Sequence, residues 1–140
     1  AVQSTTSNRA TSEDGNLKLW TEAKEYAFGD TLEVFFEVSQ PTYVTLIDIT
    51  PDGEKTVIFP NAAMRDNYCR PGTTYRIPPV DSPLQIEVTG PAGKDRIIAF
   101  TSDKSGLDSR VIQTRGVKFT SKLVATTQSR AAISIDIKEK

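Results

Sequence analysis

The chain of 140 residues contains no histidine and only one cysteine, Cys69. Without histidine, Ser-His-Asp catalysis, Cys-His catalysis and histidine metal ligation are excluded. A single cysteine excludes both an intramolecular disulfide framework and a zinc site built from several cysteines. We therefore expect a protein that uses no metal or other cofactor and is not an enzyme.

Long apolar runs are also missing. No segment approaches the roughly 18 apolar residues that a membrane-spanning helix requires, so we expect no such segment in this chain. Residues 1–15 (AVQSTTSNRATSEDG) hold too few apolar side chains to offset the entropy lost on ordering them. The sequence thus predicts a flexible leader over 1–15 and a single domain over 16–140.

Period-two patterning of apolar residues dominates that domain. In residues 31–39 (TLEVFFEVS), Leu32, Val34, Phe36 and Val38 share one face, and Glu33, Phe35 and Glu37 share the other. This alternation is typical of a half-buried strand. Residues 43–50 (YVTLIDIT) are apolar on both faces and predict a central strand. The turn at 51–53 and the run 56–59 then complete a hairpin over 43–59.

Further strands are expected on both sides of these. They are 17–20, 73–77, a second hairpin over 84–101 and a C-terminal strand over 133–137, which gives about eight strands in all. Residues 105–116 interrupt the alternating apolar pattern and predict a short helix that ends at Gly116. Many short strands separated by proline and glycine turns predict an all-β antiparallel β-sandwich, immunoglobulin-like in architecture.

An ordered set of short motifs resembles a known bacterial family. They are Leu17-Lys18-Leu19-Trp20, Tyr26 with Gly29-Asp30, Tyr43-Val44 running to Pro51-Asp52-Gly53, Ile58-Phe59-Pro60-Asn61, then Gly72, Tyr75, Ile77-Pro78 and Gly90-Pro91-Ala92-Gly93. Over residues 17 to about 102 the chain is similar to domain-of-unknown-function family 4384. The resemblance implies a β-rich accessory domain of exported proteins, located in the periplasm or cell envelope, with no catalytic residues to assign.

The motif residues Trp20, Gly29, Asp30, Phe59, Pro60 and Asn61 have structural explanations. Glycine before a strand permits a positive φ, and the Asp30 carboxylate can accept backbone N–H groups of the turn. Phe59 would close the core edge, Pro60 would end the strand, and Asn61 would cap the following loop.

Without histidine, acid-base chemistry would require carboxylates. Glu33 and Glu37 share a strand face, but an exposed polar face explains them equally well. Asp48 lies in an apolar strand, where a carboxylate must find a partner or reach water. The acidic residues lack the spacing of a calcium loop, so no metal site is expected.

Two surfaces remain as binding candidates. The loop over 61–72 (NAAMRDNYCRPG) carries Met64, Arg65, Tyr68 and Arg70, residue types enriched in protein interfaces, although Met64 and Tyr68 could instead fold back onto the core. Residues 104–130 hold six basic residues against Asp108, and Arg110, Arg115 and Lys118 are the candidates there. With one aromatic residue in that segment, nucleic acid is not expected as a partner.

The sequence therefore predicts a non-catalytic interaction module that binds another envelope protein or an anionic envelope polymer. Binding would use the loop over 61–72, the basic segment over 104–130 or an exposed sheet edge by strand addition. The alternative is a carbohydrate- or small-ligand-binding module. Such a site would need an exposed aromatic platform, for which Trp20, Phe35, Tyr43 and Tyr75 are the candidates.

Overall fold

The computed structural model describes residues 8–103 and 127–140. These residues form twelve strands: β1 (Asn8–Thr11), β2 (Leu17–Thr21), β3 (Glu25–Ala27), β4 (Thr31–Leu32), β5 (Val34–Val38), β6 (Thr42–Ile49), β7 (Lys55–Phe59), β8 (Tyr68–Cys69), β9 (Tyr75–Ile77), β10 (Ile86–Glu87), β11 (Gly93–Ser102) and β12 (Thr127–Lys138). Within the described ranges, no helix is long and apolar enough to cross a membrane.

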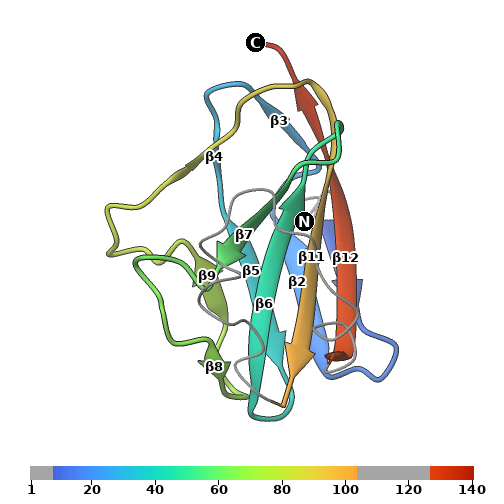
Figure 1. The fold of residues 1–140 in the computed structure, drawn as a ribbon, viewed down its shortest axis with the longest axis vertical. Helices are drawn as coiled ribbons and strands as arrows, with labels where there is room; N and C mark the ends of the chain where they lie inside the picture. The colour runs from blue at the N-terminus through green and yellow to red at the C-terminus, as the bar shows by residue number, and fades with distance from the viewer. Residues whose placement is uncertain (1–7, 104–126) are drawn as a thin grey trace, which may run out of the picture.

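Two sheets pack against each other in a β-sandwich, as the sequence predicts. One sheet has the strand order β1-β2-β5-β9, and the other has the order β3-β12-β11-β6-β7 with β8 beside β6. In Figure 1 the sheet that contains β6, β11 and β12 lies in front of the sheet that contains β2 and β5. Strands β4 and β10 form a separate ribbon. Among the described strands, only the pairing of β12 with β3 is parallel.

Strand β5 shows how alternation builds the core. Val34, Phe36 and Val38 are buried, while Phe35 and Glu37 are partly exposed on the other face. The Phe36 ring stacks on Tyr75 with centroids 5.0 Å apart and tilts against Phe59 at 5.6 Å. The predicted half-buried strand is confirmed, with one interruption at Glu33, where β4 leaves to pair with β10.

Strand β6 is buried on both faces and is central, as expected. It pairs with β11 on one side and β7 on the other, which confirms the predicted hairpin over 43–59. Its residues Val44 and Leu46 enter the main core. On the opposite face Ile47 packs with Ile98 and Phe100 in a second apolar cluster.

The predicted hairpin over 84–101 is wrong. Strand β10 pairs with β4, with Ile86 opposite Leu32, and β11 pairs with β12 and β6 instead. Both edges of β11 are therefore occupied over its central residues, and a strand has only two edges to offer. Proximity along the chain favoured the hairpin, but competition for β11 decided against it.

The predicted flexible leader is wrong for residues 8–15. Strand β1 pairs with β2 from Asn8 opposite Thr21 to Thr11 opposite Lys18, and Ser12 is buried. Backbone hydrogen bonds to β2 order this segment even though it has few apolar side chains to bury. Residues 1–7 and the predicted helix over 105–116 lie outside the described residues.

The motif residues around the turns occupy the positions that their chemistry suggests. Gly29 has a φ of +94°, and the Asp30 carboxylate accepts the backbone N–H of Ala27 at 2.8 Å. Phe59 is fully buried and Pro60 lies buried beside it at the end of β7. These residues therefore serve the fold.

Phe36 and Phe35 offer a matched test of the two faces of β5. Replacing Phe36 with alanine removes a buried ring from the core, so we expect a loss of about 3–5 kcal/mol in the free energy of unfolding. Phe35→Ala should cost clearly less, because its ring is partly exposed. Urea unfolding of both variants measures the difference, and equal losses would contradict this assignment of faces.

Candidate functional site

The loop over residues 61–72 is held in place at its start by Asn61. Its side-chain N–H donates to the carbonyl of Ile58 at 2.8 Å, and its side-chain oxygen accepts the backbone N–H groups of Ala63 and Met64, each at 2.9 Å. One asparagine side chain thus ties the loop to the end of β7. This is the capping role that the sequence suggested for it.

Three further hydrogen bonds hold the second half of the loop. The buried Asn67 side chain donates to the Val44 carbonyl of β6 at 3.0 Å, and Asp66 accepts the backbone N–H of Tyr68 at 3.0 Å. The backbone N–H of Arg70 donates to the Tyr75 hydroxyl at 2.8 Å. The loop is therefore preorganised by its own polar side chains and by the sheet below it.

The candidate residues of this loop divide into two groups. Met64 is partly buried and packs against the main core, whereas Tyr68 is 40% exposed. The Tyr68 ring rests edge-on against Tyr43, with centroids 5.0 Å apart, and the Arg70 guanidinium lies 5.9 Å from the Tyr68 ring centroid. Arg65 and Arg70 are exposed. The structure thus brings Tyr68 and Arg70 together on the surface and turns Met64 inward.

The second predicted surface is only partly described. Arg110, Arg115 and Lys118 lie outside the described residues. Arg130, the last basic residue of that segment, lies on β12 with its side chain exposed.

The four aromatic candidates for a carbohydrate platform fall into three separate places. Trp20 and Phe35 do lie side by side on the outer face of β2 and β5, with ring centroids 5.8 Å apart and planes 10° apart. The Arg9 guanidinium lies over the Trp20 ring, 4.9 Å from its centroid. Contacts with Phe35 and Arg9 therefore occupy part of the indole surface that a sugar ring would need. Tyr75 stacks on Phe36, and Tyr43 packs against Tyr68.

The two candidate glutamates act as surface partners. Glu33 forms an ion pair with Arg76 at 3.2 Å, and Glu37 accepts a hydrogen bond from the Thr74 hydroxyl. The Glu33 carboxylate is therefore bound to β9, and the Glu37 carboxylate to the residue just before β9. In the described part of the chain, no group of three or more acidic or cysteine side chains is arranged to hold a metal ion.

Asp48 lies in an apolar strand, and its side chain is hydrogen-bonded to a second carboxyl group, that of Asp95. It stands opposite Ile97 of the core and lies close to Asp95, which is only 8% exposed. Burial, then hydrogen bonding to Asp95 and repulsion by its charge, raises the pKa of Asp48 to about 8. One Asp48 oxygen, Oδ1, is buried and has no hydrogen-bond partner among the described residues. The pair therefore holds a proton at neutral pH.

Cys69 is buried and unreactive. Burial, followed by the negative charge of Asp66, raises the pKa of its thiol to about 12. The neighbouring Arg70 does not activate it, because a thiol with such a pKa stays protonated at neutral pH.

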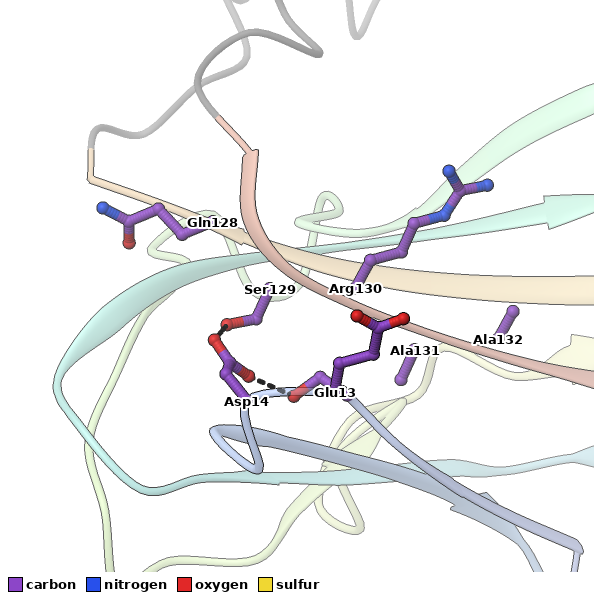
Figure 2. Close-up of a pocket in the computed structure, with 8 residues that line it drawn as sticks. Glu13, Asp14, Gln128, Ser129, Arg130, Ala131 and Ala132 are labelled. Carbon is purple, nitrogen blue, oxygen red and sulfur yellow. Dashed lines mark hydrogen bonds between the residues drawn. The ribbon is translucent and has the colours of Figure 1, made fainter.

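A groove between the turn that follows β1 and the start of β12 was not predicted from the sequence. It has a volume of about 500 Å³ and is lined by Ser12, Glu13, Asp14, Gln128, Ser129, Arg130, Ala131 and Ala132 (Figure 2). The two walls of the groove are more than 110 positions apart in sequence, so no local sequence motif indicates the groove. Because the sequence predicts a flexible leader over 1–15, it gives no reason to expect Ser12, Glu13 and Asp14 in the wall of a groove.

Asp14 joins the two walls of this groove. Its carboxylate accepts hydrogen bonds from the hydroxyls of Ser12 and Ser129, each at 2.6 Å (Figure 2). It also accepts the backbone N–H of Asn16 at 3.1 Å. These bonds, with that of Ser12 the strongest influence, lower the pKa of Asp14 to about 2. So weak a base does not abstract protons near neutrality, and its role is to fix the turn against β12.

Asp48 should make the protein less stable as the pH rises. Its pKa is raised on folding, so the stabilising protonated form is fully present below about pH 4 and is lost as the pH passes through 8. We expect Asp48→Asn to gain on the order of 1–3 kcal/mol at pH 9, because the amide can donate to Asp95 without carrying a charge. Urea unfolding between pH 5 and 9 measures this.

The absence of histidine makes that range informative, since few other side chains titrate in it. The exposed Asp136, whose pKa is lowered by its hydrogen bond to Lys94, is the control. In Asp136→Asn, the free energy of unfolding should change with pH as it does in the wild type. If the free energy of unfolding of Asp48→Asn changed with pH as much as that of the wild type, the pH dependence would have another source than Asp48.

Asp14 predicts the opposite dependence on pH. Its pKa is lowered on folding, so its stabilisation is present above about pH 4 and is lost as the pH falls toward 2. Asp14→Ala should therefore lower the melting temperature at pH 7, and the difference from wild type should shrink near pH 2. The adjacent exposed Glu13→Ala is the control and should change little. A deficit that persists unchanged at pH 2 would contradict the assigned role.

Comparison with known proteins places the chain in a family. No curated protein and no solved structure matches it significantly. A family model described as a domain of unknown function, DUF4384, matches residues 25–105. The match runs from β3 past the end of β11, so it contains the loop over 61–72 and excludes the residues that line the groove. With more than half of its length matched, the chain belongs to the DUF4384 family.

Proposed function

We propose that this protein is a non-catalytic interaction module that binds another protein through the loop over residues 61–72. The observation that carries the proposal is the pairing of Tyr68 and Arg70 on a loop held by its own side chains. Tyrosine and arginine are the residue types that most often supply binding energy at protein interfaces.

Preorganisation is the physical reason for choosing this loop. Binding normally costs entropy, because side chains and loops must be ordered at the interface. Here the hydrogen bonds of Asn61 and Asn67 hold the backbone before any partner arrives, and Tyr43 braces the Tyr68 ring. A partner would therefore gain the contacts of Tyr68 and Arg70 at a small ordering cost.

The proposed setting is the bacterial cell envelope, with the partner another envelope protein. The family resemblance supports this location. Cys69 is compatible with it, because a buried thiol with a raised pKa does not form disulfides in an oxidising compartment. An anionic envelope polymer is the second candidate partner, and it would be bound by Arg110, Arg115 and Lys118.

Capture of partners from envelope extract tests the proposal. We expect Tyr68→Ala combined with Arg70→Ala to reduce capture about tenfold or more, since interface hot spots contribute at least about 2 kcal/mol. The matched control is Arg96→Ala, an exposed arginine on β11, which should leave capture unchanged.

Charge reversal at Arg110, Arg115 and Lys118 is the second arm. Loss of capture there, with the Tyr68 and Arg70 variant unaffected, would reject the loop in favour of the basic segment. If neither set of variants changes capture, both proposed surfaces fail.

A further inference from the structure

Among the described strands, β12 has a partner on only one side for much of its length. It pairs with β11 from Thr127 to Ile137, whereas β3 pairs with its other edge only from Asp136 to Lys138. Among the described strands, none pairs with that edge between Gln128 and Ser134. An unpaired strand edge presents N–H and C=O groups that can bind another extended chain.

The hydrogen bonds at both ends of this edge show which residues face outward. The N–H of Asp136 donates outward to the carbonyl of Lys24 at 2.7 Å, and the carbonyl of Ser134 accepts from the Asn8 side chain at 2.7 Å. The N–H of Ser129 points the other way, to the Thr101 hydroxyl at 3.0 Å. Because direction alternates along a strand, the N–H and C=O groups of Arg130 and Ala132 also face outward.

This open edge lies along the groove described above. The turn with Asp14 stands beside it, and the bond from Asn8 to Ser134 closes the other end. The open length from Gln128 to Ala132 is about 17 Å at the usual rise per strand residue. A short extended segment fits such a recess. A second copy fits poorly, because edge-to-edge pairing would bring the Asp14 turns of both copies against the opposing strands.

Charge indicates the composition of that segment. Glu13 and Arg130 are both exposed, and among the described residues neither forms an ion pair. Figure 2 shows the Arg130 guanidinium extending away from the Glu13 carboxylate. Arg130 stands opposite Phe100 of the second apolar cluster, so it lies on the outer face of its sheet. A residue added beside it would share that face, and opposite charge there is favourable.

We propose that the edge of β12 between Gln128 and Ala132 binds an extended segment of a partner protein by strand addition, with an acidic residue of the segment beside Arg130. The outward groups of Arg130 and Ala132 form the new backbone hydrogen bonds. The next residue of the segment faces the opposite side of the sheet. This surface is separate from the loop over 61–72 and does not depend on it.

Selection from a display library of random ten-residue peptides tests this inference. We expect enriched peptides to carry an acidic residue at one recurrent position. Arg130→Glu should weaken these peptides at least tenfold and should select basic residues in place of the acidic one. Arg96→Glu, which reverses an arginine on paired β11, is the control and should bind the selected peptides as wild type does.

Amide hydrogen exchange supplies a readout that needs no folded variant. In the free protein, the amides of Arg130 and Ala132 should exchange faster than those of Ala131 and Ile133, which point toward β11. A selected peptide should slow the first two at least tenfold and leave the others unchanged. Ala132→Pro, which removes one outward N–H, should abolish peptide binding if circular dichroism shows that it keeps the fold.

The inference is overturned if no peptide is enriched, if Arg130→Glu binds the selected peptides as wild type does, or if binding leaves the exchange of Arg130 and Ala132 unchanged. The Tyr68 and Arg70 variant separates the two proposals. It should retain peptide binding at β12 even where it loses capture of an envelope partner.

Discussion

The pairing of β11 on both of its edges is the constraint on which the larger sheet depends. Pairing with β6 and β12 uses the hydrogen-bonding groups of both edges of β11. Strand β10, although nearest in sequence, must therefore find another partner and pairs with β4. The same arrangement places β12 outside β11, where β3 covers only its last residues. The open edge of β12 is thus a consequence of how the sheet is assembled.

Polar side chains hold together the parts of the structure that apolar packing does not reach. Asp14 fixes the turn after β1 to Ser129, and Asn61 and Asn67 fix the loop over 61–72 to the sheet. Asp14 and Asn61 each form three such hydrogen bonds, so they replace the water that the loop backbone would otherwise bind. In this way a domain with few apolar residues in its loops still presents ordered surfaces.

The two carboxylates that stand out, Asp14 and Asp48, have opposite relations to stability because their surroundings differ. Asp14 is exposed and accepts several hydrogen bonds, which favour its charged form. Asp48 is largely buried beside a second carboxyl group, and both burial and that neighbour favour its neutral form.

The sequence by itself determined the sandwich class, the central position of residues 43–50, and the faces of β5, because alternation with period two is a local property that burial of one face enforces. It also placed Asn61 as a loop cap, since that chemistry acts within a few residues. Only the tertiary structure decided which strand pairs with β10, that residues 8–15 are ordered, and that a groove lies beside β12. Those features depend on competition for strand edges and on hydrogen bonds such as Ser129 to Asp14, between residues that no local pattern connects.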